Sequence, residues 1–217
     1  MNSIRLPLAA SLVLVGSLLA GRAQIPMATD YFARQNKMDV YGIGQYLHQD
    51  DAKFTGASGQ TTRLKLDDTG LGGFGFAYHF NDFLAVHADF MLGPATFTVV
   101  PPQGASYEFG DNGLISSGRF NLDYNIINRR ITPFITAGIG YQYMQVDQGY
   151  WYHYGYYYYD YYSETDFTWN VGAGVRWNIT DNFFIKVTGG AQWLTYQGAD
   201  NISTQIEGFF AIGMTFP

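Results

Sequence analysis

Residues 73–90 have the sequence GFGFAYHFNDFLAVHADF. Aromatic and aliphatic side chains alternate with small or polar ones on both sides of a short central segment, residues 81–83. A period of two is typical of β-strands, whose successive side chains point to opposite faces. If residues 81–83 form a turn, Tyr78 lies opposite Val86 and the apolar faces of the two strands coincide. The stretch therefore predicts an antiparallel hairpin with one apolar and one polar face.

The same pattern recurs along the chain. Residues 172–190 have the sequence GAGVRWNITDNFFIKVTGG, a second hairpin pattern lies at 119–143, and a last alternating strand lies at 206–216. The alternating strands are around ten residues long, the length of a tilted strand that crosses a bilayer. The connections near Asn81, Asn128 and Asp181 are short, whereas those at residues 48–69, 94–113, 146–166 and 196–203 are long. This alternation predicts that the short turns lie at the periplasmic end and the long loops outside.

The first strand, residues 38–47, has the least regular alternation. We expect it mainly because closing a barrel of this type needs an even number of strands. The residues expected to face outward are Tyr41, Ile43 and Leu47, and those expected to face inward are Gly42, Gly44 and Tyr46.

Periodicity alone does not say which face of a closed barrel is outside. A soluble barrel such as a lipocalin would keep its apolar side chains inside, around a ligand cavity. An outward apolar face is favoured because the other face carries small residues and opposed charges, and because aromatic residues lie near strand ends. Those expected at the periplasmic boundary are Tyr124, Trp177, Phe183 and Phe216, and those nearer the outer boundary are Phe74, Tyr143, Trp169 and Trp193. The predicted fold is all-β, an eight-stranded antiparallel up-and-down transmembrane β-barrel.

Composition and charge narrow the class further. Aromatic residues make up 18% of the chain and charged residues only 14%, whereas charged residues are about a quarter of a soluble domain. The chain has no cysteine, which excludes disulfides and thiolate metal sites. Its net charge of −6 argues against a nucleic-acid partner.

The N-terminus has the features of an export signal. Arg5 precedes the apolar residues 6–19 and the small residues near Ala23. This run is shorter than the roughly 20 residues that a spanning helix needs. We expect a signal peptide at 1–23, a periplasmic segment at 24–37 and the barrel at 38–217, in the outer membrane of a Gram-negative bacterium.

The inward face carries charged and ionisable side chains that we expect to form a luminal polar network. These are His79, His87, Asp89, Arg119, Asp123, Arg176, Lys186 and Glu207. Paired charges cost far less in a confined interior than isolated ones. His79 and His87 would lie roughly 8 Å apart on adjacent strands, too far for one zinc ion and without a third ligand. We therefore predict no catalytic, cofactor or metal site.

These features resemble the small outer-membrane barrels of the OmpA and OmpX type. The resemblance rests on the signal peptide, the hairpin at 73–90, the strand PFITAGIGY at 133–141 and the aromatic close at Phe216. It implies that Phe216 is read by the outer-membrane insertion machinery, and that membrane lipid and lipopolysaccharide surround the barrel. The peptidoglycan-binding domain of longer members is not expected.

The third long connection is unusually aromatic, since nine of the thirteen residues from Tyr150 to Tyr162 are tyrosine. Such rings suit contacts with an extracellular protein or glycan. The candidate contact residues are Tyr150, Trp151, Tyr152, Tyr154, Tyr156 and Tyr158. Alternatively, the segment continues its two strands above the membrane and stacks on itself and on lipopolysaccharide. A structural or surface-interaction protein is our first hypothesis, a narrow channel gated by luminal charges the second, and a barrel enzyme the third.

Overall fold

The computed structural model describes residues 31–56, 59–153, 156–194 and 199–217. The predicted signal peptide and the first part of the predicted periplasmic segment lie outside these residues. Every regular element in the described part is a β-strand. No helix in those ranges is long and apolar enough to cross a membrane.

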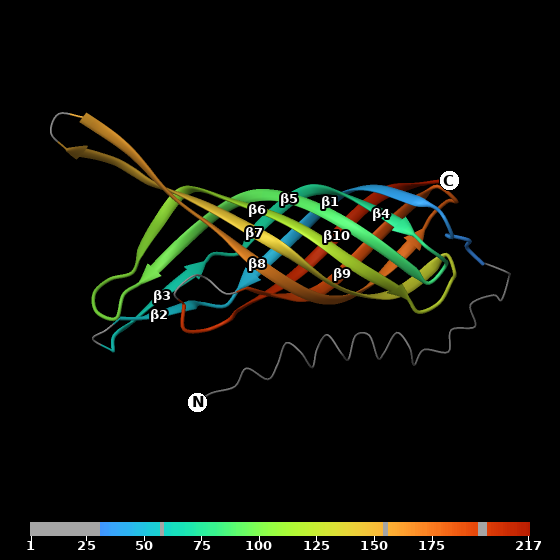
Figure 1. Cartoon of the computed structure of the whole chain (residues 1–217), viewed down its shortest axis with the longest axis horizontal. Coiled ribbons are helices and arrows are strands. Elements are labelled where there is room, and N and C mark those ends of the chain that lie inside the picture. Colours follow the sequence, from blue (N-terminus) through green and yellow to red (C-terminus); the bar gives the residue numbers. More distant parts are fainter. Residues whose placement is uncertain (1–30, 57–58, 154–155, 195–198) are drawn as a thin grey trace. The chain divides into compact units, whose positions relative to one another are not determined.

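Eight strands close into one antiparallel barrel, as predicted (Figure 1). They are β1 (Met38–Gln49), β4 (Thr69–His79), β5 (Leu84–Val100), β6 (Tyr107–Asn125), β7 (Ile131–His153), β8 (Tyr156–Asn178), β9 (Phe183–Leu194) and β10 (Ser203–Phe216). The ring closes because β1 pairs with both β4 and β10, and β5 pairs with β6. A further hairpin, β2 (Ala52–Thr55) and β3 (Thr61–Leu66), joins the ring through pairing of β3 with the far end of β5.

The β4–β5 hairpin has the register expected from the sequence. Tyr78 pairs with Val86 as predicted. Asn81 holds the turn, because its side-chain oxygen accepts hydrogen bonds from the backbone N–H groups of Phe83 and Leu84, each at 2.8 Å. Short polar side chains stabilise turns in this way.

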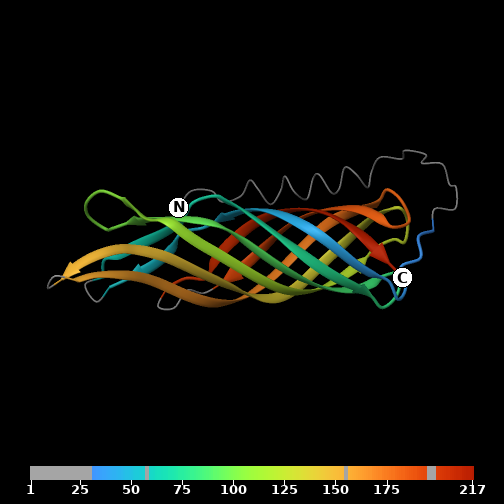
Figure 2. The same cartoon turned by 90° about the horizontal axis from the view of Figure 1, so that it is seen from above.

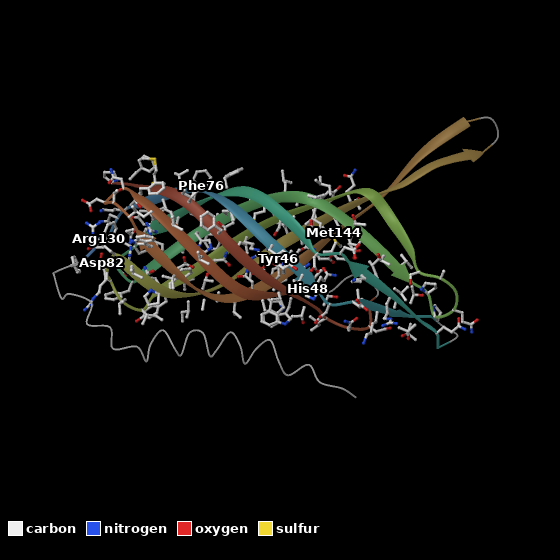
Figure 3. All side chains as sticks on the ribbon, turned by 180° about the vertical axis from the view of Figure 1, so that it is seen from behind. Tyr46, His48, Phe76, Asp82, Arg130 and Met144 are labelled. Atoms are coloured by element: carbon white, nitrogen blue, oxygen red, sulfur yellow. The ribbon has the colours of Figure 1, made fainter. Side chains whose placement is uncertain are left out.

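The apolar side chains point away from the lumen. Phe76 is 43% exposed on the outside of the wall (Figure 3), and Trp169 stacks on Trp193 with ring centroids 4.2 Å apart. Other exposed members of this outer face are Phe74, Phe90, Leu92, Phe120, Leu122, Tyr124, Ile135, Ile139, Trp177, Phe210, Ile212, Met214 and Phe216. An apolar exterior beside a polar interior is the reverse of a lipocalin-like barrel and fits a wall surrounded by lipid.

The two faces of β1 are the reverse of our prediction, which was wrong. Tyr41 and Leu47 are buried inside the barrel, as is Ile43, whereas Tyr46 is 54% exposed on the outside. The cause is Asp39, whose carboxylate forms an ion pair with Arg176 in the lumen. Because side chains alternate along a strand, one inward residue sets the direction of all the others.

Two of the predicted long loops are largely strand. Only residues 101–106 separate β5 from β6, and only 154–155 separate β7 from β8. The β7–β8 hairpin consequently extends well past the rest of the barrel (Figures 1 and 2). Aromatic residues favour strands, which explains why the tyrosine-rich segment continues the ladder, with Trp151 opposite Tyr158.

The short turns lie at one end of the barrel, which we call the periplasmic end. They comprise residues 80–83, 126–130 and 179–182. Figure 3 shows Asp82 and Arg130 from two of these turns at the end opposite to the β7–β8 hairpin. The last residue of β10, Phe216, pairs with Met38 at the start of β1, so both strand ends lie there too.

Candidate functional site: the polar lumen and its periplasmic closure

The segment that precedes β1 closes the periplasmic end of the barrel. Arg34 is fully buried, and its guanidinium donates hydrogen bonds to the hydroxyl of Thr132 at 2.6 Å and to the carbonyl of Arg129 at 3.0 Å. Burial, together with the nearby charge of Arg176, lowers the pKa of Arg34 to about 10. The side chain remains charged at neutral pH and binds the β6–β7 turn to the N-terminal segment.

Asp82, in the β4–β5 turn, holds the same segment from the other side. Its carboxylate accepts hydrogen bonds from the backbone N–H groups of Arg34 at 2.7 Å and Gln35 at 3.2 Å, and from the hydroxyl of Tyr31. Although partial burial opposes it, these hydrogen bonds lower the pKa of Asp82 below its ordinary value. Residues 31–37 thus form a strap across the barrel end, which we call the periplasmic strap.

The first luminal layer joins four strands through one arginine. Arg176 on β8 forms an ion pair with Asp39 on β1, and its Nη2 atom donates to the hydroxyl of Thr215 on β10 at 2.9 Å. The Nε2 atom of His79 on β4 lies 2.8 Å from the same Asp39 carboxylate. The guanidinium also packs over the ring of Phe184, 3.9 Å from its centroid. The charge is therefore paired, hydrogen-bonded and shielded, as a buried charge requires.

The second layer is built around His87 on β5. One ring nitrogen lies 3.2 Å from the carboxylate of Asp123, and the other lies 3.2 Å from that of Asp89. Lys186 on β9 donates to Asp123 at 2.8 Å, and the hydroxyl of Tyr41 donates to Asp89 at 2.8 Å. Each carboxylate thus has two partners from different strands, which cross-links opposite walls of the barrel.

The third layer is a buried, two-pronged ion pair. Arg119 on β6 donates to Glu207 on β10 through both terminal nitrogens, at 2.8 and 2.5 Å. Gln45 donates to the same carboxylate at 3.1 Å. Two parallel hydrogen bonds from a guanidinium are among the strongest polar contacts in proteins. This pair connects strands that do not neighbour each other in the sheet.

Beyond the charges lies a row of glutamines and then an apolar core. Gln192 donates to Gln142 at 3.2 Å and to Gln205 at 2.8 Å, and Gln205 donates to Gln49 at 2.6 Å. Toward the extracellular end the interior is filled by buried apolar residues, namely Leu47, Leu66, Met91, Phe97, Ile115, Met144 and Leu194. The lumen therefore changes along the barrel from charged layers to glutamines, with the buried Asp166 opposite Gln142, and then to apolar residues.

Little free space remains between these layers. A cavity of about 30 Å³ lies beside His87, Arg119 and Glu207. A second cavity, of about 10 Å³, lies beside Asp39 and Arg176. Volumes of this size hold roughly one water molecule. In the described ranges, no group of three or more His, Asp or Glu side chains is arranged to hold a metal ion.

Comparison with known proteins identifies the fold. No protein-family model matches the chain, and no curated protein matches its sequence. The outer membrane protein OprG from Pseudomonas aeruginosa matches with a TM-score of 0.55 at 13% identity, over 84% of this chain and 97% of OprG. Neisserial surface protein A matches with a TM-score of 0.52 at 13% identity, over 82% of this chain and 95% of that protein. The fold is that of a small outer-membrane barrel. Together with the apolar exterior, this fold places the protein in the bacterial outer membrane.

The lumen of this outer-membrane barrel contains all the residues that the sequence suggested for it, but in several groups rather than one network. His79 and Arg176 share the first layer, and Arg119 and Glu207 form the third. The others, His87, Asp89, Asp123 and Lys186, meet in the second layer. The lumen also contains the carboxylates of Asp39 and Asp166 and, at the barrel end, the guanidinium of Arg34, none of which the sequence suggested for it.

Several residues of the lumen were not predicted from the sequence. Asp39 and Tyr41 were missed because the faces of β1 were assigned in reverse, and the alternation of Asp39, Tyr41, Ile43 and Gln45 could have revealed them. The glutamine row was missed because the sequence analysis considered only charged and ionisable side chains for the lumen. The other candidate set, in the β7–β8 hairpin, is located only by its backbone. Tyr154 and the side chains of residues 146–162 lie outside the described part of the chain.

Proposed function

We propose that the protein is a closed structural barrel that presents the β7–β8 hairpin as an aromatic contact surface outside the cell. The difference in strand length carries this proposal. β7 and β8 have 23 residues each, whereas β4 has 11 and β9 has 12. About ten residues are enough for a tilted strand to cross a bilayer. Roughly half of this hairpin therefore extends beyond the membrane-spanning wall.

The filled lumen supports a structural role over the alternative of a narrow channel. Each of the three charged layers contains an ion pair that joins different strands, and the cavities beside them hold about one water molecule each. A conducting path would have to break all three charged layers, the glutamine row and the periplasmic strap together. The luminal groups are also occupied by one another, which argues against a barrel enzyme.

The composition of the hairpin supports a role in recognition. Its tyrosine rings offer large contact areas with few rotatable bonds, and their hydroxyls can bind polar groups of a protein or a glycan. The ladder between β7 and β8 shifts register once, between Asp147 and Gly149, and then reaches His153 opposite Tyr156. It supports these residues on a sheet rather than on a long irregular loop. A pre-ordered backbone lowers the entropy lost on binding.

The contact surface is tested by replacing the six candidate aromatic residues of the hairpin with serine. Purified wild-type and variant barrels are applied to a glycan microarray and to an array of extracellular proteins. A matched variant carrying phenylalanine at the same positions keeps the rings and removes the hydroxyls. We expect the serine variant to lose at least about tenfold in binding, and the phenylalanine variant to lose less. Equal binding by wild type and serine variant would contradict the proposal.

The closed lumen is tested separately by single-channel recording in planar bilayers. We expect no stable conductance from the wild type, because three layers of ion pairs block the lumen. An Arg176→Gln variant removes one layer only and is expected to stay closed as well. A stable conductance in the wild type would instead favour the channel hypothesis.

A further inference from the structure

The basic residues of the extracellular connections lie in a single segment of the chain. Lys53, Arg63 and Lys65 all fall between β1 and β4, and no Lys or Arg occurs in residues 66–118, 131–175 or 187–217. The same segment also contains Asp50, Asp51, Asp67 and Asp68, and Asp200 lies in the connection between β9 and β10. An anionic ligand that approaches from outside therefore finds Lys and Arg side chains in this segment only, and it can bind only where they stand apart from these carboxylates.

The β2–β3 hairpin brings these three cations onto one face of a sheet. Lys53 pairs directly with Arg63 across the two strands, and Lys65 follows two residues later on the same side of β3. All three side chains are exposed. Thr55 and Thr61 lie on the same face, with their hydroxyl oxygens 3.1 Å apart. We call this set of five residues the basic hairpin face; all of its side chains can donate hydrogen bonds.

The opposite side of the hairpin fixes this face in position. Ala52 and Leu66 are fully buried against the apolar core of the barrel, and Phe54 and Leu64 pack at its edge. The backbone of β3 is paired on both sides, with β2 and with residues 97–100 of β5. The cations consequently stand on a supported sheet, and their spacing is set by the strands.

The basic hairpin face lies just above the apolar band of the wall. Tyr46 is exposed on the outside of β1, and its hydroxyl donates to Asp68 at 2.5 Å. An outward tyrosine with a bonded hydroxyl is typical of a membrane boundary. Lys65 precedes Asp68 by three residues, a distance of about 10 Å along an extended chain. Figure 3 shows His48 nearer than Tyr46 to the end of the barrel from which the β7–β8 hairpin projects.

The local carboxylates leave these cations available. Asp51 lies 3.7 Å from Arg63, and Asp67 lies 3.7 Å from Lys65, and all four side chains are at least one-third exposed. Exposed pairs at such distances contribute little. Within the described ranges, no carboxylate lies within ion-pair distance of Lys53. The carboxylate of Asp200 accepts a hydrogen bond from the backbone N–H of Thr55 at 2.6 Å and is thus held by the backbone of β2. A phosphate at the side chains of the face would displace two weak ion pairs and gain three cations and two hydroxyls.

We propose that the basic hairpin face binds the phosphate groups of lipopolysaccharide in the outer leaflet. These phosphates sit directly above the acyl chains, at the level where the cations lie. The proposal rests on the outer-membrane location. It is independent of any partner of the β7–β8 hairpin, which the aromatic replacements test by themselves.

The test compares two variants that each remove two positive charges. Arg63→Gln with Lys65→Gln changes the basic hairpin face, whereas Lys37→Gln with Arg130→Gln changes the periplasmic end. The probes are deep-rough lipopolysaccharide and the same lipid after enzymatic removal of its phosphates. Dissociation constants are measured with the refolded full-length mature protein in detergent, in the presence of EDTA. Unchanged heat-modifiability on gels shows that each variant is folded.

We expect the hairpin variant to bind phosphorylated lipid about 30-fold more weakly, since each cation near an anionic lipid surface contributes about fivefold. The periplasmic variant should bind like wild type, and all three proteins should bind the dephosphorylated lipid equally weakly. The charge-preserving variant Arg63→Lys with Lys65→Arg should restore binding. Equal affinity of wild type for both lipids, an equal loss in the periplasmic variant, or loss of wild-type binding in EDTA would each overturn the proposal.

Discussion

The two ends of the lumen have opposite polarity, and β5 shows this along a single strand. After Ala85, its inward row contains His87 and Asp89 and then changes to Met91, Ala95 and Phe97. Its outward row changes in the opposite sense, from exposed Phe90 and Leu92 to residues 96 and 98, which are threonines. The alternation of faces is the same throughout. Only the chemistry of each face changes.

This difference shows where the surroundings of the wall change from lipid to water. Beside lipid, the outer row must be apolar, and the polar residues that remain inside have to pair with one another. Above the lipid, water surrounds the wall, and the barrel buries its apolar row as a soluble protein does. The same strand therefore passes from lipid to water while its side chains keep alternating, although its pairing with β6 shifts register between Ala95 and Phe97.

The largest loss of folding stability is expected when an ion pair at the charged end of the lumen is removed. Arg176→Gln leaves the carboxylate of Asp39 buried without its cation. Loss of one partner of a buried ion pair destabilises by about 3–5 kcal/mol. Urea unfolding in detergent micelles would measure this loss.

A second replacement distinguishes the loss of the ion pair from a general disturbance of packing in the lumen. Adding Asp39→Asn to Arg176→Gln removes the unpaired charge, so the double variant should be more stable than Arg176→Gln alone. Losses that simply add in the double variant would show that the two residues do not depend on each other.

A smaller loss of folding stability is expected when a side chain at the apolar end of the lumen is shortened. Ile115 is completely buried there, and Ile115→Ala should cost about 2–3 kcal/mol, in the lower part of the range for a buried isoleucine. The matched variant Ile115→Val should cost about 1 kcal/mol. Urea unfolding followed by hydrogen exchange should show that protection is lost first around β2 and β3. Equal loss of protection throughout the barrel would contradict a separate apolar end.

The smallest effect concerns the periplasmic strap and depends on pH. The pKa of Asp82 is lowered in the folded protein, so its contribution is present above the ordinary pKa of about 4. It is lost as the pH falls through the lowered value, when the carboxylate is protonated. Hydrogen exchange at the amides of Arg34 and Gln35 should therefore become faster in acid. Asp82→Asn should remove most of this pH dependence, and an unchanged profile in that variant would argue against the carboxylate as the cause.

The sequence predicted the faces of most strands but not the partners inside the lumen. Alternation placed Arg176 and Glu207 inward correctly, because each depends only on its neighbours along the strand. The partner of Arg176 is Asp39, 137 residues away. A local sequence pattern gives no information about a residue so far away in the chain. The partner of Arg176 depends on which strands the closed ring brings together.

The sequence by itself determined the membrane-spanning part of the strands, the short turns at one end and, except on β1, the apolar exterior, since these follow from alternation and turn residues close together in the chain. The tertiary structure alone decided the direction of β1, the layers of ion pairs and glutamines, and the position of the β2–β3 hairpin. All three depend on the pairing of β1 with β10 and of β3 with β5. Such contacts join distant parts of the chain, so only closure of the barrel fixes them.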